Sequence, residues 1–131
     1  MNELQSSLKA ASAGMQRQAL RLRLTSENMA NADTPGFQRK LAVFDASDIQ
    51  NSDGRLGNSP RIELDKTNLT EVHDPSHPLA DENGNYSGSN VNLLIEISDA
   101  REAQRSYEAN LKMFEQARKM SSSLMDLLRR S

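Results

Sequence analysis

The residue types that most often do chemistry lie in one short stretch of this chain. Its two histidines, His73 and His77, stand there beside the carboxylates Asp74, Asp81 and Glu82. Imidazole and carboxylate groups bind zinc and other transition metals, and histidine is the commonest general base. The spacing of these residues, however, matches no established metal site. No glycine-rich phosphate loop or nucleophile elbow accompanies them. We therefore expect no catalytic residue, no metal and no cofactor.

The end of this stretch has the composition of a calcium loop but not its spacing. In the run from Asp81 to Asn85, the glycine is the fourth residue, whereas a calcium loop needs it at the sixth. No bidentate glutamate follows at the twelfth position. The run therefore predicts a turn.

Composition limits the size of the hydrophobic core. The chain has 131 residues, of which 36% are apolar and 4% aromatic, with no Trp. Globular domains usually contain roughly 45–50% apolar residues. We expect one domain with a thin core, and an isolated copy of marginal stability that gains from binding to other chains.

The charge of the chain argues against nucleic acid as a partner. The absence of cysteine does not distinguish a reducing from an oxidising compartment. The 16 basic and 18 acidic residues give a net charge of -2 and form no long run of one sign, so nucleic acid is not an expected partner. The chain has no Cys. It is therefore compatible with reducing and oxidising compartments alike.

The N-terminal part of the chain carries an apolar pattern with the period of a helix that packs against another helix. Apolar or small residues return at steps of four and three from residue 4 to residue 29, with polar Gln18 and Thr25 at two of the steps. This heptad seam predicts one helix over residues 2–30. Its apolar or small members are Leu4, Leu8, Ala11, Met15, Leu22 and Met29.

The C-terminal part carries a second seam, which predicts a helix from Val91 to about Arg129. Such a helix is far longer than the mean of about three turns in globular proteins. We expect the two helices to form an antiparallel, coiled-coil-like pair in which the first covers only part of the second. The apolar or small members of this seam are Leu93, Ile97, Ala100, Tyr107, Leu111, Phe114, Met125 and Leu128.

Two features of the seams each allow two interpretations. The polar members either restrict the register and the number of partners or simply face water. They are Gln18, Thr25, Gln104, Arg118 and Ser121. Gly14 either lets a partner backbone approach closely or is merely tolerated within its helix.

The middle of the chain is rich in turn signals. Thr34-Pro35-Gly36 ends the first helix, because the proline disfavours helical geometry at the residue before it. Other turn signals include Asp53-Gly54 and residues 57–60. The expected fold is mainly α with a small irregular or β central segment, divided into residues 1–36, 37–90 and 91–131.

Two strands are predicted in this central segment. One covers Gln38 to Phe44, with Leu41 and Val43 on one face. The other covers residues 61–72, where Ile62, Leu64, Leu69 and Val72 alternate in part.

One motif is specific enough to indicate a family. The stretch SENMANADTPGF, from Ser26 to Phe37, closely resembles the signature of bacterial flagellar rod and hook proteins. Residues 74–84 and 106–110 resemble the proximal rod members of that family. We assign the turn from Asn31 to Phe37 to positioning the central segment against a neighbouring subunit. The residues of the family turn motif are Asn28, Asn31, Thr34, Pro35, Gly36 and Phe37.

The resemblance implies a structural role without enzymatic activity. Members form the basal-body rod, the drive shaft of the flagellum, by packing their terminal helices within and between subunits. The implied partners are other proximal and distal rod proteins, proteins at the junction of the rod base and the MS ring, and the flagellar export apparatus. Such members reach the periplasm by type III export without a Sec signal, and no Sec-type signal is visible in residues 1–13. No insertion into a membrane is expected.

An alternative function uses the same seams differently. A helical adaptor or regulator would close its seams into one discrete oligomer. A rod subunit is instead expected to stay monomeric when dilute and to polymerise when concentrated, because a heterologous contact that does not close continues as a helix.

Overall fold

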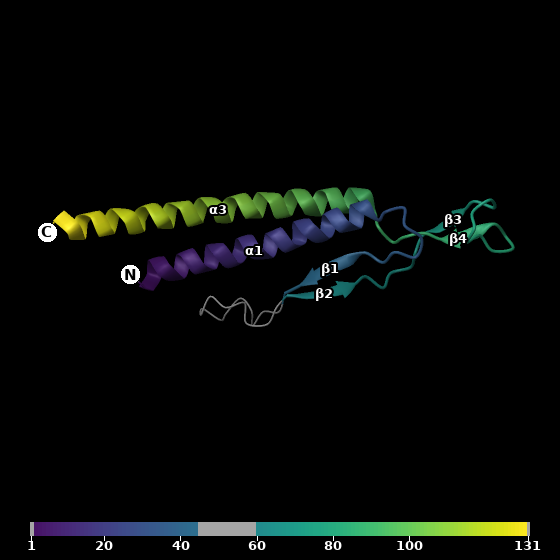
Figure 1. Ribbon diagram of the computed structural model, residues 1–131, viewed down its shortest axis with the longest axis horizontal. Helices are drawn as coiled ribbons and strands as arrows, with labels where there is room; N and C mark the ends of the chain where they lie inside the picture. The colour runs from purple at the N-terminus through teal and green to yellow at the C-terminus, as the bar shows by residue number, and fades with distance from the viewer. Residues whose placement is uncertain (1, 45–59, 131) are drawn as a thin grey trace.

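The computed structural model describes residues 2–44 and 60–130, and in them the chain forms two long helices and two small β-hairpins. The elements are α1 Asn2–Ala30, β1 Lys40–Val43, β2 Arg61–Leu64, β3 Glu71–His73, β4 Asn85–Ser87 and α3 Leu93–Arg130. The helices lie side by side with both chain termini at the same end (Figure 1). The mainly α fold and the antiparallel helix pair are as the sequence predicts.

Local signals explain where the helices stop and start. After α1, the side-chain amide of Asn31 donates to the carbonyl oxygen of Glu27, which satisfies a carbonyl of the last turn. Gly36 then takes a φ of 75°, in the left-handed region that glycine favours. Before α3, the side-chain oxygen of Asn92 accepts the N–H of Leu94, as an N-cap residue does.

Two contacts define the register of the helix pair. The side chain of Asn28 donates to Glu96 at 3.2 Å. A Cβ added at Gly14 would lie 2.6 Å from Oδ1 of Asn110. Gly14 is fourteen residues before Asn28, and Asn110 is fourteen residues after Glu96, so both contacts belong to one antiparallel register two heptads long. The missing side chain of Gly14 makes room for Asn110, which favours the close-approach interpretation.

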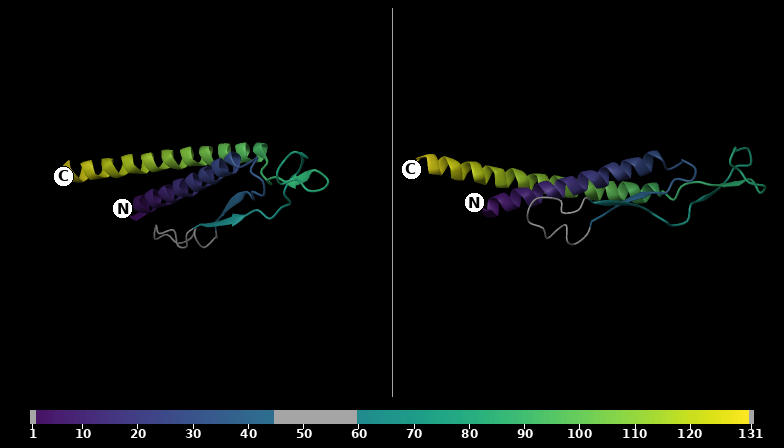
Figure 2. Two further views of the ribbon diagram at one scale, coloured as in Figure 1. Left: turned by 45° about the vertical axis from the view of Figure 1, so that its right-hand side comes forward. Right: turned by 60° about the horizontal axis from the view of Figure 1, so that its bottom comes forward.

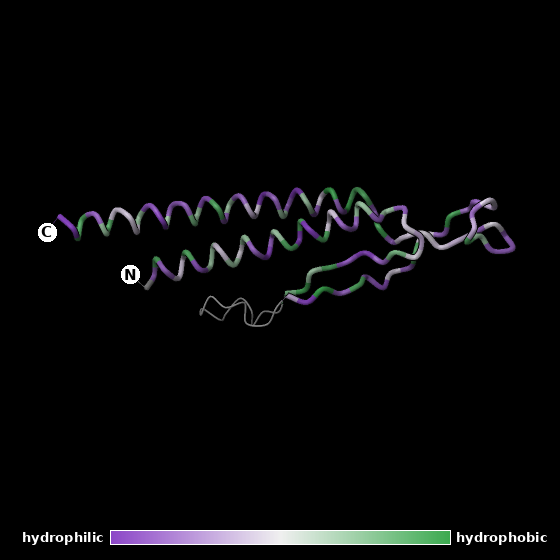
Figure 3. The backbone as a smooth tube through the Cα atoms, viewed as in Figure 1, coloured by the Kyte–Doolittle hydropathy of each residue, from purple (hydrophilic) through white to green (hydrophobic). Residues whose placement is uncertain are grey.

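The most buried positions of α3 are occupied by small and polar residues. Glu96, Ala103 and Ala117 are buried, and half-buried Asn110 completes this row at steps of seven. Among the described residues, the buried apolar side chains are Ala11, Leu24, Ala103 and Ala117. The core is as thin as the composition predicts, and apolar and polar positions alternate along both helices (Figure 3).

The central segment forms two separate antiparallel hairpins. In the first, Lys40 pairs with Leu64 and Val43 with Arg61. In the second, Glu71 pairs with Ser87. The β1–β2 hairpin lies along α1, whereas the β3–β4 hairpin projects beyond the helices at the end opposite the termini (Figures 1 and 2).

The prediction of one strand over residues 61–72 was wrong. The chain turns after β2, where the carboxylate of Asp65 accepts the N–H of Thr67. The side-chain amide of Asn90 donates to the carbonyl oxygens of both residues and holds the turn. Leu69 therefore lies in a connection, and Val72 belongs to the second hairpin. The strand predicted over residues 38–44 is confirmed as β1, whereas the turn signals at 53–54 and 57–59 lie outside the described residues.

The contact between Gly14 and Asn110 predicts the effect of a larger side chain. Gly14→Leu should lower the free energy of unfolding by about 1–3 kcal/mol, the usual cost of overpacking. Urea unfolding followed by circular dichroism measures the change. Ala10→Leu, at an exposed position of the same helix, is the matched control.

Asn110→Ala should reduce the cost of Gly14→Leu, because it removes the side chain that the leucine would meet. Equal losses for Gly14→Leu and Ala10→Leu would contradict this account of the register.

Candidate assembly site

Asn28, in the motif stretch, connects three elements. Its side-chain oxygen accepts the N–H of Lys40 at 2.8 Å, and its amide donates to the carbonyl oxygen of Lys40 at 3.0 Å. The amide also donates to Glu96 of α3. Asn28 is only 1% exposed. One buried amide thus pairs with the first residue of β1 as a neighbouring strand would, and joins that strand to both helices.

Arg39 extends this connection to the turn after β2. Its Nε donates to Glu96 at 2.7 Å, and its terminal nitrogens reach Asp65 at 3.2 Å and Asp99 at 3.4 Å. The Arg39 N–H donates to the Asn90 side chain at 2.6 Å. We call Asn28, Arg39, Asp65, Asn90 and Glu96 the junction. Since Glu96 is fully buried, its charge depends on Arg39 and Asn28 for compensation.

The electrostatics of the junction favour the charged forms of Arg39 and Asp65. Burial opposes the charge of Arg39, but hydrogen bonds and charge contacts with Glu96 and Asp65 outweigh it, so the pKa of Arg39 is raised. The Thr67 backbone N–H is the main cause of the lowered pKa of Asp65, and its hydroxyl and Arg39 add to the effect. Both groups are therefore ionised at neutral pH.

The rest of the motif forms the turn that leads from α1 to the hairpins. The hydroxyl of Thr34 donates to the side chain of Asn31, and the N–H of Phe37 donates to the carbonyl oxygen of Thr34. The N–H of Gly36 donates to the carbonyl oxygen of Gly88 at 3.0 Å. Pro35 and Gly36 are exposed, and Phe37 is half-buried.

The structure places the seam residues of α1 mostly inside the molecule. Ala11 is buried, and the others are half-buried: Leu4, Leu8, Met15, Leu22 and Met29. Of the polar seam members of α1, Thr25 is buried and Gln18 half-buried, and the Thr25 hydroxyl donates to the carbonyl oxygen of Leu22 within its own helix.

The seam of α3 is divided between the inside and the outside. Ala100, Tyr107 and Phe114 are half-buried. The other five are exposed: Leu93, Ile97, Leu111, Met125 and Leu128. Among the polar seam members of α3, Gln104 and Arg118 are also exposed. Leu93, Ile97 and Leu111 lie at heptad-related positions on one flank of α3, which we call the outer stripe.

Sequence reasoning missed the most buried row of α3. Glu96, Ala103 and Ala117 each stand one residue before a predicted seam member, and a search for large apolar residues passes over them. Small residues spaced by seven were the signal available, because they allow close helix packing. Arg39 and Glu96 carried no such signal, since charged residues are usually exposed.

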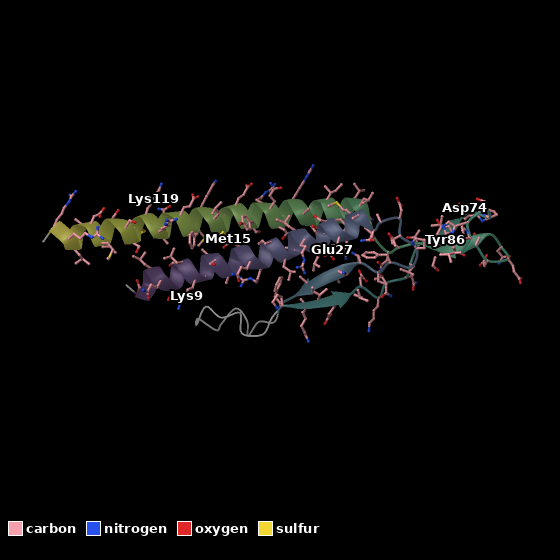
Figure 4. The ribbon with its side chains drawn as sticks, viewed as in Figure 1. Lys9, Met15, Glu27, Asp74, Tyr86 and Lys119 are labelled. Atoms are coloured by element: carbon pink, nitrogen blue, oxygen red, sulfur yellow. The ribbon has the colours of Figure 1, made fainter. Side chains whose placement is uncertain are left out.

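The two histidines have protein partners in the β3–β4 hairpin. Nδ1 of His73 lies 2.7 Å from the side-chain oxygen of Asn85. The ring of His77 stacks on Tyr86 with centroids 3.9 Å apart. Asp81 accepts the N–H groups of Asn83 and Asn85 and so forms the predicted turn. Figure 4 shows Asp74 and Tyr86 on this hairpin, far from Lys119 on α3.

Comparisons with known proteins agree with the motif. Residues 8–38 match the family described as flagella basal body rod protein. Residues 82–127 match the family described as flagellar basal body rod FlgEFG protein C-terminal. The flagellar basal-body rod protein FlgC of Agrobacterium fabrum is 40% identical over the whole of this chain and 99% of its own length. The chain belongs to the FlgC family of flagellar basal-body rod proteins.

More distant relatives carry the same name. FlgC of Borreliella burgdorferi is 32% identical over 94% of this chain and 96% of its own length. FlgC of Salmonella typhimurium is 30% identical over 89% of this chain and 92% of its own length. The family makes the chain a structural subunit of the basal-body rod. Among the described helices, none is long and apolar enough to cross a membrane.

The junction predicts that Asn28 is important for stability. Asn28→Ala leaves the peptide of Lys40 and one oxygen of Glu96 without their partner, and should lower the free energy of unfolding by about 1–3 kcal/mol. Chemical unfolding of the purified chain measures this change. Ser26→Ala, at an exposed position of the same helix, should have almost no effect. Similar stability of the two variants would refute this role.

The positive φ of Gly36 gives a second prediction. Apart from Gly36 itself and its two chain neighbours, no residue lies within 4 Å of a Cβ added there, so Gly36→Val should impair rod assembly through backbone strain alone. Gly36→Asn is the matched control, because asparagine tolerates this conformation better. Recovery of each variant in purified basal bodies is the measurement. Wild-type recovery of the valine variant would count against this assignment.

Proposed function

We propose that this rod protein assembles through the apolar residues that its own helix pair leaves exposed on α3. The observation that carries the proposal is the outer stripe, whose Leu93, Ile97 and Leu111 stay in contact with water while small residues fill the internal interface. Exposed apolar residues gathered on one side of a helix mark interaction sites in soluble proteins, and exposed Gln104 is the polar position between Ile97 and Leu111. A neighbouring helix that covers the stripe would remove it from water.

The junction supports this function because it fixes the orientation of the β1–β2 hairpin relative to the helix that carries the outer stripe. Arg39 and Asn28 connect the β1–β2 hairpin to both helices through Glu96. A subunit docked on α3 therefore meets a hairpin of defined orientation. We propose that the turn motif, through Gly36 and Asn31, positions the central segment against a neighbour in the same way. The parts 1–36, 37–90 and 91–131 then act as an axial helix with its turn, a central segment and a second axial helix.

The proposed partners follow from the family. They are other proximal and distal rod proteins, the proteins between the rod base and the MS ring, and, before assembly, the flagellar export apparatus. The rod location implies passage into the periplasm by type III export, for which a marginally stable chain is suited because little folding free energy opposes threading. The role is structural rather than enzymatic.

Charged substitutions on the outer stripe test the proposal. Leu111→Asp and Ile97→Asp should each abolish incorporation into the rod, because a buried unpaired carboxylate is costly at a helix interface. Export should persist, since both positions are exposed in the single subunit. The measurements are motility, recovery in basal bodies and recovery in the periplasmic fraction.

Gln116→Asp is the control for these variants. It adds the same charge at an exposed polar position of α3 outside the outer stripe, and should leave motility unchanged. Wild-type motility of both stripe variants would sink the proposal.

A further inference from the structure

Asn83 and Gly84 form the only asparagine–glycine pair in the sequence. They lie in the loop between β3 and β4, on the hairpin that projects beyond the helices (Figure 1). In such a pair the backbone nitrogen of the glycine can attack the side-chain carbonyl carbon of the asparagine, because glycine has no Cβ to hinder the approach. The pair is therefore a candidate site of covalent modification without an enzyme.

The fold of the loop requires the glycine of this pair. Gly84 has a φ of 79°, in the left-handed region that glycine favours. A Cβ added to it would lie 2.8 Å from Cγ of Pro75 and 3.1 Å from Cε1 of His73. Both the backbone conformation and the close packing exclude a larger residue. The loop thus places a glycine after Asn83 for structural reasons, and the chemical reactivity of the pair is a consequence.

The side chain of Asn83 is available for reaction in the folded chain. Asn83 is exposed, and its side-chain amide makes no hydrogen bond to another residue in the described part of the chain. Water therefore reaches its carbonyl carbon, and ammonia released there can leave. The electrophile of the reaction is not protected by the fold.

The nucleophile, in contrast, is held in the turn. Gly84 is buried, and its N–H donates to the carbonyl oxygen of Asp81 at 3.0 Å. The carboxylate of Asp81 also accepts the N–H groups of Asn83 and Asn85, each at 2.9 Å. The nitrogen of Gly84 must lose its proton before it can attack, and a hydrogen-bonded amide loses its proton only when the bond opens. The turn therefore keeps this nitrogen unreactive.

We infer that Asn83 is a deamidation site that the turn of residues 81–84 keeps unreactive while the β3–β4 hairpin is formed. When the turn opens, the nitrogen of Gly84 bonds to Cγ of Asn83 and the bond from Cγ to Nδ2 breaks. Ammonia leaves and takes up the proton that Gly84 lost. Water then opens the resulting five-membered ring at either carbonyl, which gives aspartate or isoaspartate. This inference does not depend on the proposed function.

The product disrupts the hairpin that prevents its formation. In isoaspartate the main chain runs through the side chain, so an extra main-chain atom separates residue 83 from Gly84. The carbonyl oxygen of Gly84 accepts the N–H of Asp74 at 2.9 Å, and this contact across the loop depends on the original spacing. Either product also adds a negative charge beside Asp81 and Glu82, where like charges repel. An opening that leads to reaction is therefore recorded as a permanent change.

Peptide mapping of the full chain by mass spectrometry tests the inference. The chain is incubated at mildly alkaline pH, either folded or in guanidinium chloride, and conversion of Asn83 to the two aspartyl forms is followed with time. Conversion should be slower in the folded chain by at least about tenfold, which corresponds to an opening free energy of about 1.4 kcal/mol. Hydrogen exchange of the Gly84 amide should be slowed by a similar factor, because both reactions begin with the loss of the same proton.

Two variants test whether the turn is the cause of the protection. Asp81→Ala removes the acceptor of two N–H groups in the turn and should bring the folded rate close to the denatured rate. Glu82→Ala is the matched control, because it removes the same charge from an exposed neighbouring position, and should leave the folded rate unchanged. Circular dichroism checks that both variants keep the helices.

Equal conversion rates in the folded and denatured wild-type chain would overturn the protective role of the turn. An unchanged Asn83 in the denatured chain would overturn the site itself. A folded rate that Asp81→Ala does not raise, or that Glu82→Ala raises equally, would overturn the inference as well. If Asp81→Ala does not fold, the wild-type comparison and the hydrogen exchange of Gly84 decide between these outcomes.

Discussion

The structure depends on the compensation of one buried charge. Glu96 is inside the helix pair, where an ionised carboxylate without partners would be strongly destabilising. Arg39 and Asn28 are the partners that compensate it, and each also holds the β1–β2 hairpin. The same contacts therefore set the register of the helices and the place of the central segment, so the two cannot vary independently.

This register determines which side chains remain for other molecules. The interface between α1 and α3 contains Gly14, Ala103 and Ala117, and these small residues allow the helices to approach closely. The larger aliphatic residues of α3 are left on the flank and at both ends of the helix. A single subunit thus has a thin core and much exposed apolar surface, which is the combination expected of a subunit that completes its packing only in an assembly.

The sequence predicted the helices well because long heptad patterns and a Thr-Pro-Gly turn are local signals. The second predicted strand was wrong, since its break at Asp65 depends on Asn90, which is distant in the sequence. In the first heptad of α3, Glu96 is buried and the predicted seam member Ile97 is exposed, because Glu96 finds its partners in Arg39 and Asn28. The role of Arg39 could not be predicted without the fold, because its three carboxylate partners come from α3 and from the turn after β2.

The most direct test of the account is side-chain footprinting by hydroxyl radicals, which compares the dilute purified chain with the chain in intact basal bodies. Ile97 and Leu111 should react readily in the dilute chain, where both are exposed, and should be protected in the basal body. Equal reactivity of these two residues in both states, with the chain present in the basal body, would contradict the account.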